Sequence, residues 1–223
     1  MISNLRCDGI YDLRTLRYLK SLGLSKFSFD FSPRSSNFLP EHIFFDKILP
    51  ETDKSDELFF FFENFDLIMV NRLLHKLESI TQNNRKFVFE FNNINTPDFS
   101  QLETKFITNF NFDSQIEVTH LKNCIGLSID YFLIETLYHR KNLHNFVNNF
   151  HVRYYDLLRN GLKLICNFHG SDSINYDILN AFDFDLFSLK IDSKLETCYR
   201  NVNFPLLAKM IRDISSNYNT PNK

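Results

Sequence analysis

Short apolar or strand-forming runs alternate with amphipathic, helix-length segments along almost the whole chain. This alternation is the pattern expected of βα units around a parallel sheet. The continuous run Leu-Phe-Phe-Phe-Phe suits a strand buried on both faces, as the strands of a covered parallel sheet are. The pattern predicts strands at residues 4–7, 26–31, 58–62, 86–91, 115–121, 131–134, 162–166 and 186–191.

Helix start and stop signals lie between the predicted strands. Asp12 is placed to cap a helix that ends at Gly23, and Asn142 is placed to cap a Phe-rich helix that ends at Gly161. Pro205 suits the first turn of a last helix. The segment 96–112 fits either a helix or a long loop with one helical turn. The surplus of aromatic residues in the Phe-rich helix leaves room for a dimer contact.

Eight such units favour a single (β/α)₈ barrel, the TIM barrel, that spans residues 1–223 as one domain. A length of 223 residues is ordinary for one barrel. An open doubly wound sheet is the alternative, and it would want a glycine-rich first turn. The turn at residues 7–12 lacks the G-x-G-x-x-G pattern, so the closed barrel is preferred.

Charge and composition narrow the classes of partner. A net charge of -2 supplies no basic field for a nucleic acid, and no stretch is long and apolar enough to span a membrane. The chain starts without a targeting segment, which leads us to expect a cytoplasmic protein. The four cysteines are widely spaced and predict reduced, structural thiols. The spacing of His139, His144 and His151 matches no metal motif, so neither a metal nor another cofactor is implied.

The stretch from residue 6 to residue 38 is the most specific segment of the chain. It resembles the start of phosphoribosylanthranilate isomerase, a family that opens with Lys-Ile-Cys-Gly-Ile-Thr and continues through a helix, a Gly, a Gly-Phe-x-Phe strand and Pro-x-Ser-x-Arg. An alignment without gaps matches these positions in order: Arg6, Cys7, Asp8, Gly9, Ile10, Gly23, Phe29, Phe31, Pro33 and Ser35. The resemblance implies a (β/α)₈ barrel that catalyses an Amadori rearrangement.

In that family a base removes a proton from C2 of an iminium that an acid has helped to form. The ungapped alignment places Asp8, rather than Cys7, at the position of the base, and an alignment with an insertion would place Cys7 there. Strand alternation puts Arg6 and Asp8 on one face and Cys7 on the other. The family's acid ends the sixth strand, and the predicted strand at 131–134 offers Glu135. Two carboxylates in different surroundings can divide the two roles.

The resemblance also implies positions that bind the substrate, a phosphorylated small molecule. They are Arg34, Ser35 and Asn37 after the second strand, Asn167 on the seventh strand, and Ser193 and Lys194 after the eighth strand. Several depart from the family: Asn37 replaces an arginine, Asn167 and Phe168 replace a Gly-Gly pair, and Asp192 would repel a phosphate that Lys194 could attract.

The resemblance implies an isomerase of tryptophan biosynthesis that acts on a phosphoribosyl amine, and we expect a monomer or homodimer. The departures support a second hypothesis, a barrel that has lost the reaction and serves as a binding or interaction protein. A third hypothesis is an isomerase or lyase for another phosphorylated small molecule.

Overall fold

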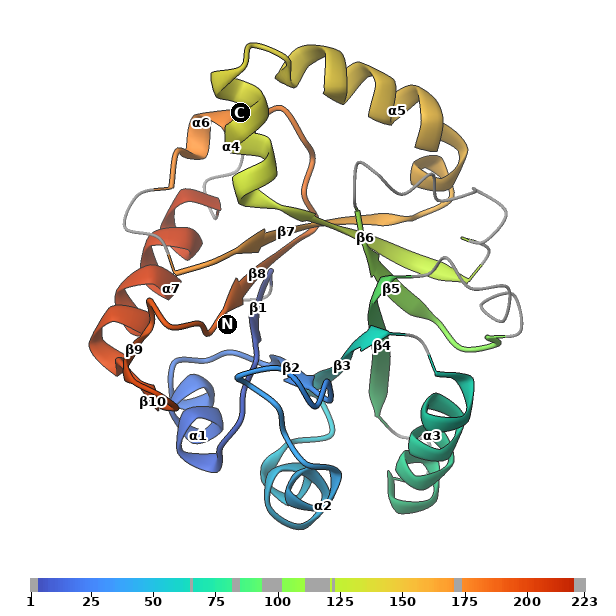
Figure 1. The fold of residues 1–223 in the computed structure, drawn as a ribbon, viewed down its shortest axis with the longest axis vertical. Helices are drawn as coiled ribbons and strands as arrows, with labels where there is room; N and C mark the ends of the chain where they lie inside the picture. Colours follow the sequence, from blue (N-terminus) through green and yellow to red (C-terminus); the bar gives the residue numbers. More distant parts are fainter. Residues whose placement is uncertain are drawn as a thin grey trace.

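Eight parallel strands pair in chain order from β1 to β8, and β8 pairs with β1, so the sheet closes into a barrel (Figure 1). The computed structural model describes residues 4–64, 66–81, 85–93, 102–110, 121, 123–170 and 174–218. The predicted (β/α)₈ barrel is confirmed, and the open-sheet alternative is wrong. The strands of the barrel are β1 (Leu5–Asp8), β2 (Lys26–Asp30), β3 (Glu57–Asn64), β4 (Lys86–Asn93), β5 (Phe106–Asn109), β6 (Cys124–Asp130), β7 (Lys163–Phe168) and β8 (Leu186–Lys190).

Six of the predicted strands agree with the barrel, and the predicted fifth and sixth strands do not. The fifth strand is β5, which falls in the segment read as a helix or loop. Of the predicted strand 115–121, residues 115–120 lie outside the described residues, and Leu121 is not in a strand. The residues predicted as the sixth strand, 131–134, begin helix α4 (Tyr131–His139) instead. Asp130 precedes them and accepts a hydrogen bond from the Phe132 amide at 2.8 Å, so an N-cap outweighs the strand propensity of this apolar run.

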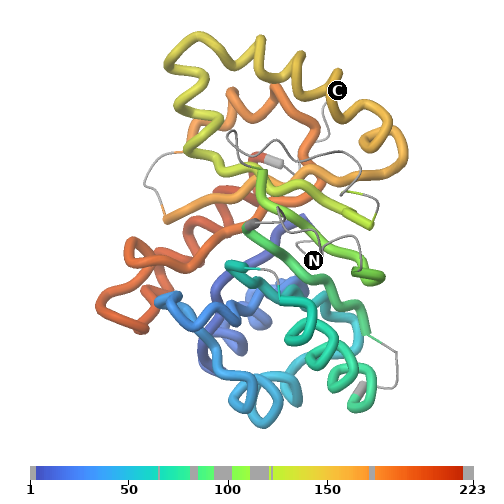
Figure 2. The backbone as a smooth tube through the Cα atoms, turned by 45° about the vertical axis from the view of Figure 1, so that its right-hand side comes forward, coloured from blue at the N-terminus to red at the C-terminus, as the bar shows by residue number. Residues whose placement is uncertain are grey.

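Helices lie around the outside of the strands in both views of the fold (Figure 1, Figure 2). They are α1 (Leu13–Ser21), α2 (Glu41–Ile43) with the helical turns η1 (Phe44–Ile48) and η2 (Leu49–Glu51), α3 (Leu67–Thr81), α4, α5 (Leu143–Arg159), α6 (Tyr176–Leu179) and α7 (Phe204–Tyr218). A two-stranded hairpin, β9 (Glu196–Cys198) with β10 (Asn201–Val202), precedes α7. No helix in the described part of the chain is both long and apolar enough to cross a membrane.

Helix α1 shows how local sequence sets these boundaries. Asp12 caps it, accepting a hydrogen bond from the Thr15 amide at 2.7 Å. Leu16 and Leu19 are buried against the barrel. The chain then turns at Gly23 with φ of +84°, a conformation that glycine adopts without strain. The predicted N-cap and stop signal of this helix are confirmed.

The interior of the barrel divides into an apolar floor and a polar mouth. Alternate residues of each strand point inward, and inward residues of such barrels stack in layers. Phe59, Ile107, Ile165 and Leu186 form a buried cluster of their own. Most inward residues nearer the carboxyl ends of the strands are polar and include Ser28, Glu90 and Ser128, which are buried.

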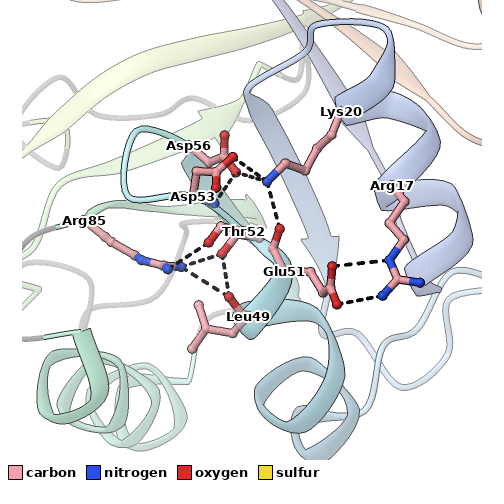
Figure 3. Close-up of polar contacts among 8 residues, drawn as sticks. All are labelled: Arg17, Lys20, Leu49, Glu51, Thr52, Asp53, Asp56 and Arg85. Atoms are coloured by element: carbon pink, nitrogen blue, oxygen red, sulfur yellow. Dashed lines mark hydrogen bonds and ion pairs between the residues drawn. The ribbon is translucent and has the colours of Figure 1, made fainter.

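Polar contacts tie the loops at the opposite end of the barrel, where the strands begin (Figure 3). Lys20 of α1 forms ion pairs with Asp53 at 2.6 Å and with Asp56 at 3.4 Å. Arg17 forms an ion pair with Glu51 at 2.7 Å on the surface. These contacts fasten α1 to the segment that leads into β3.

Arg85, which directly precedes β4, makes partly buried contacts with the same segment. Its guanidinium donates to the Thr52 carbonyl at 2.9 Å, to the Thr52 hydroxyl and to the Leu49 carbonyl at 3.4 Å. Replacing Arg85 by alanine leaves these carbonyls without a charged donor, and we expect it to lower the free energy of unfolding by about 1–3 kcal/mol. Urea denaturation of Arg85→Ala measures this loss, and Arg17→Ala serves as the control. Arg17 belongs to an exposed ion pair, and such a pair contributes only about 0–1 kcal/mol. Equal losses in the two variants would contradict this account.

Candidate active site

A polar cavity of about 290 Å³ opens at the carboxyl ends of the strands. Active sites of (β/α)₈ barrels form at this end. The cavity is lined by Asp8, Gly9, Ser28, Asp30, Phe61, Glu90, Asn92, Asn109, Phe110, Ser128, Asp130, Asn167, His169 and Lys190. Most of the lining residues carry a carboxylate, amide or hydroxyl group, so the cavity suits a small ligand with many hydrogen-bonding groups.

Asp8 lies in this cavity and Cys7 does not. Asp8 ends β1 and lines the cavity, whereas Cys7 is fully buried in the cluster between the barrel and its helices. Burial raises the pKa of the Cys7 thiol well above its usual value, so the thiol stays protonated at neutral pH. The cavity therefore offers Asp8, and not Cys7, as a base from β1.

The Asp8 carboxylate is held by the buried side chain of Arg6. The Arg6 Nη2 donates to Asp8 Oδ2 at 2.8 Å, and Nε lies 2.7 Å from Asp8 Oδ1. Ser188 of β8 also donates to Asp8 through its hydroxyl. The Arg6 Nη1 lies 2.7 Å from the Glu90 Oε2 across the barrel. One fully buried arginine thus pairs with two carboxylates and fixes the direction of Asp8.

The pKa values of Arg6 and Glu90 respond differently to burial. Burial opposes the charge of Arg6, but the charges of Asp8 and Glu90 outweigh it and raise the pKa of the guanidinium. Burial raises the pKa of Glu90, and Arg6 opposes that shift. Glu90 therefore takes up a proton more readily than an ordinary glutamate does.

The carboxylate at the end of β6 is Asp130, not Glu135. Asp130 lines the cavity and caps α4, whereas Glu135 lies on α4 and accepts a hydrogen bond from the Tyr131 hydroxyl at 3.2 Å. Glu135 is not among the residues that line the cavity. The expected position of Glu135 is wrong because the sixth strand ends before Tyr131, five residues earlier than an acid at Glu135 requires.

Asp130 forms a hydrogen-bonded ion pair with His169, the residue that follows β7. The His169 Nε2 lies 3.0 Å from Asp130 Oδ2, and its Nδ1 lies 3.6 Å from Asp192 Oδ2. The hydrogen bonds to Asp130 and Asp192 raise the pKa of His169 to about 9, although burial opposes this. Burial opposes charge on Asp130, but His169 outweighs it and lowers the pKa of Asp130. At neutral pH the proton of the pair resides on the imidazole.

The raised pKa of His169 predicts that stability depends on pH. The folded pKa of about 9 exceeds the ordinary 6.5, so the folded protein binds more protons between these values. The stabilisation is complete below pH 6.5 and is lost as pH rises toward 9. Because the His169 side chain is 39% exposed, we expect it to add only about 1–2 kcal/mol to the free energy of unfolding. Urea denaturation of wild type and His169→Gln on both sides of this window measures it, and a constant difference would contradict the assignment.

The predicted substrate-binding residues after β2 lie outside the cavity lining. Arg34 is exposed, and Ser35 accepts a hydrogen bond from the Asn37 amide at 3.1 Å. The buried Asn37 side chain donates to the Ile191 carbonyl and packs against Gly9. A side chain on Gly9 would collide with Asn37, and φ there is +75°, so this close approach needs glycine. Asn37 joins two loops and does not face the ligand space.

The predicted residues on β7 and after β8 divide between the cavity and the surface. Asn167 lines the cavity, where its Oδ1 accepts a hydrogen bond from the Ser128 hydroxyl at 2.9 Å. Ser193 and Lys194 are exposed and are not part of the lining. Lys190, which ends β8, does line the cavity and brings a cationic side chain to its mouth.

Several cavity residues carry a signal that the sequence prediction missed. Strands β2, β4, β6 and β8 each place two polar residues two positions apart at their carboxyl ends, and alternation points both members inward. These pairs are Ser28 with Asp30, Glu90 with Asn92, Ser128 with Asp130, and Ser188 with Lys190. Asn109 ends β5 in the same way. Within the described residues, no group of three or more His, Cys, Asp or Glu residues is placed to hold a metal ion.

Comparison with known proteins supports the fold. No protein-family model and no curated protein matches this sequence. A solved phosphoribosyl anthranilate isomerase from Thermus thermophilus matches with a TM-score of 0.63 at 14% identity, covering 96% of this chain and 98% of the other. The enzyme from Thermotoga maritima matches with a TM-score of 0.62 at 11% identity, covering 96% and 98%. The chain shares their fold.

Two further structures extend this similarity. TrpF from Jonesia denitrificans matches with a TM-score of 0.59 at 11% identity, covering 94% of this chain and 95% of the other. A phosphoribosyl anthranilate isomerase in complex with reduced 1-(o-carboxyphenylamino)-1-deoxyribulose 5-phosphate matches with a TM-score of 0.61 at 12% identity, covering 96% and 99%. These TM-scores establish a common barrel architecture. Because the sequence identities are so low, the activity has to be argued from the cavity.

Proposed function

We propose that this chain catalyses an Amadori-type isomerisation, in which an N-glycosyl amine becomes an amino ketose. The observation that carries the proposal is that Asp8, ending β1, and Asp130, ending β6, line one cavity. They sit in contrasting surroundings, since Arg6 holds Asp8 and His169 holds Asp130. Such a contrast suits one base and one acid.

The Asp130–His169 pair acts as the acid in the first step. It delivers a proton to the ring oxygen of the sugar, the bond between C1 and that oxygen breaks, and the amine lone pair forms the C1=N iminium. The proton comes from the imidazole, which is protonated at neutral pH because its pKa is about 9. Asp130 orients the imidazole through their hydrogen bond of 3.0 Å.

Asp8 acts as the base in the second step. It removes the proton from C2, the C–H electrons form the C1=C2 bond, and the iminium electrons return to nitrogen. Loss of the hydroxyl proton at C2 and protonation of C1 then give the ketose. Arg6 holds the Asp8 carboxylate in a fixed direction, so the base is oriented before the substrate arrives.

The substrate that the family resemblance implies is the phosphoribosyl amine of tryptophan biosynthesis. A cytoplasmic location and a monomeric or homodimeric state belong to the proposed isomerisation, which does not depend on the 5′-phosphate. Purified protein is to be given N-ribosylanthranilate with and without the 5′-phosphate, formed in solution from anthranilate and the sugar. Ketose formation from either compound, followed by NMR, is expected. A folded protein that converts neither would contradict the proposed reaction.

A second candidate function is ligand binding without turnover. The observation that favours it is Asn37, which is buried between two loops and contributes nothing to the cavity lining. The position held by an arginine in the family therefore offers no charge to a substrate carboxylate. Saturable binding of an amino sugar without any ketose would favour this function over the isomerase.

A further inference from the structure

The loops that follow β7 and β8 are joined by one carboxylate. The Gly170 amide donates to Asp192 Oδ2 at 3.2 Å, and the Lys194 amide donates to Asp192 Oδ1 at 2.9 Å. The His169 ring lies on the same carboxylate, with its Nδ1 3.6 Å from Oδ2. Asp192 thus gathers two backbone donors and a cationic ring around its side chain.

This arrangement is how a protein backbone holds an anion. Converging amides bind phosphate and carboxylate groups, and many (β/α)₈ barrels bind phosphate with the loops after strands 7 and 8. These amides and His169 lower the pKa of Asp192 despite its partial burial, so the side chain is an anion at neutral pH. The Asp192 carboxylate of this chain therefore lies between the two loops at which many other (β/α)₈ barrels bind the phosphate group of a ligand.

The described residues around Gly170 pack closely against its backbone. A Cβ built on Gly170 would lie 2.9 Å from Asp192 Oδ1 and 2.9 Å from Leu195 Cγ. The Asp192 carboxylate therefore sits directly against the Gly170 backbone. A phosphate could reach the two amides only by displacing this carboxylate, which would give up both hydrogen bonds and the contact with His169.

The charge of the adjoining cavity points the same way. Its lining holds four carboxylate side chains and two cationic ones, and it reaches the Asp192 loops through His169. A phosphate that carries two negative charges would be repelled there. The amides of Asn92, Asn109 and Asn167, by contrast, can hydrogen-bond to sugar hydroxyls.

We propose that Asp192 is a built-in anion that fills the position between the β7 and β8 loops, and that the substrate is an amino sugar without a phosphate group. The amino-sugar part rests on the proposed function, whereas the filled anion position stands by itself. The presence of Lys194 does not alter the inference, because its amide binds Asp192 while its side chain is exposed.

Titration with inorganic phosphate, followed by calorimetry, tests the filled position. Asp192→Ser empties it, Asp192→Asn removes the charge but still fills it, and Asp183→Asn removes the same charge from an exposed site elsewhere. We expect no saturable phosphate binding by wild type, Asp192→Asn or Asp183→Asn. Asp192→Ser is expected to bind phosphate saturably, with a Kd at least about tenfold below the highest phosphate concentration at which the other three show no binding.

Each outcome of the titration decides the inference. Saturable phosphate binding by wild type would overturn it, and this measurement does not depend on any variant folding. A folded Asp192→Ser that binds no better than Asp183→Asn would also overturn it. The substrate part is tested by supplying N-ribosylanthranilate with and without the 5′-phosphate to wild type. Preference for the phosphate ester would overturn the inference, whereas conversion of neither compound would contradict the proposed reaction and leave the phosphate titration valid.

Discussion

Replacing Arg6 by methionine is expected to lower the free energy of unfolding by about 3–5 kcal/mol. Arg6 is fully buried and pairs with Asp8 and Glu90, each at 2.7 Å. Its guanidinium also lies over the Phe59 ring, 4.7 Å from the centroid. Removing the cation leaves the Asp8 and Glu90 carboxylates inside the barrel without the guanidinium that pairs with both. Urea denaturation at neutral pH measures the loss.

Two controls separate the buried ion pairs from the loss of an arginine as such. Arg212→Met changes an exposed residue of α7 and is expected to stay within about 0.5 kcal/mol of wild type. The double variant Arg6→Met with Glu90→Met removes one uncompensated carboxylate and is expected to recover part of the stability. If Arg6→Met matched Arg212→Met, the barrel interior would not depend on this network.

Replacing Asp8 by asparagine is expected to lower the turnover number by about 10²–10⁴-fold. Asparagine keeps the shape of the side chain but cannot take a proton from C2. The loss is expected in kcat more than in KM, because the proton transfer occurs only after the substrate is bound. Steady-state kinetics on N-ribosylanthranilate measures both constants.

A matched variant controls for the change of charge. Asp46→Asn alters an exposed aspartate of the helical turn η1 that is not among the residues lining the cavity, and it is expected to leave turnover unchanged. Full activity in Asp8→Asn would show that another group, such as Glu90 or Asp30, removes the proton. That result would reject Asp8 as the base while keeping the cavity as the site.

The fold was predictable because βα periodicity survives in most of this sequence. Strands that are buried on both faces, such as β3, can be recognised in the sequence as continuous apolar runs. The prediction was wrong for β5 and β6, for reasons of competing local preferences. The run after Asp130 is as apolar and aromatic as a strand, yet a capped start and burial of Tyr131 and Ile134 against the barrel make it a helix.

The candidate site was predictable only in part, since side-chain direction depends on the strand boundaries. Alternation on β1 correctly separated Asp8 from Cys7, because the ends of that strand were nearly right. Because the sixth strand was predicted at residues 131–134, Glu135 was chosen as the residue at its end, and Asp130, which ends β6, was missed. Contacts between distant loops, such as Asn37 with Ile191, leave no mark in the local sequence at all.

The central claim is that Asp8 acts as the base, and His169 held by Asp130 acts as the acid, in one cavity. One NMR time course in deuterium oxide tests it most directly, with wild type, Asp8→Asn and Asp130→Asn given N-ribosylanthranilate. Wild type is predicted to form the ketose with solvent deuterium at C1, and each variant to form it at least about 10²-fold more slowly. Ketose formation at the wild-type rate by both variants would contradict the claim.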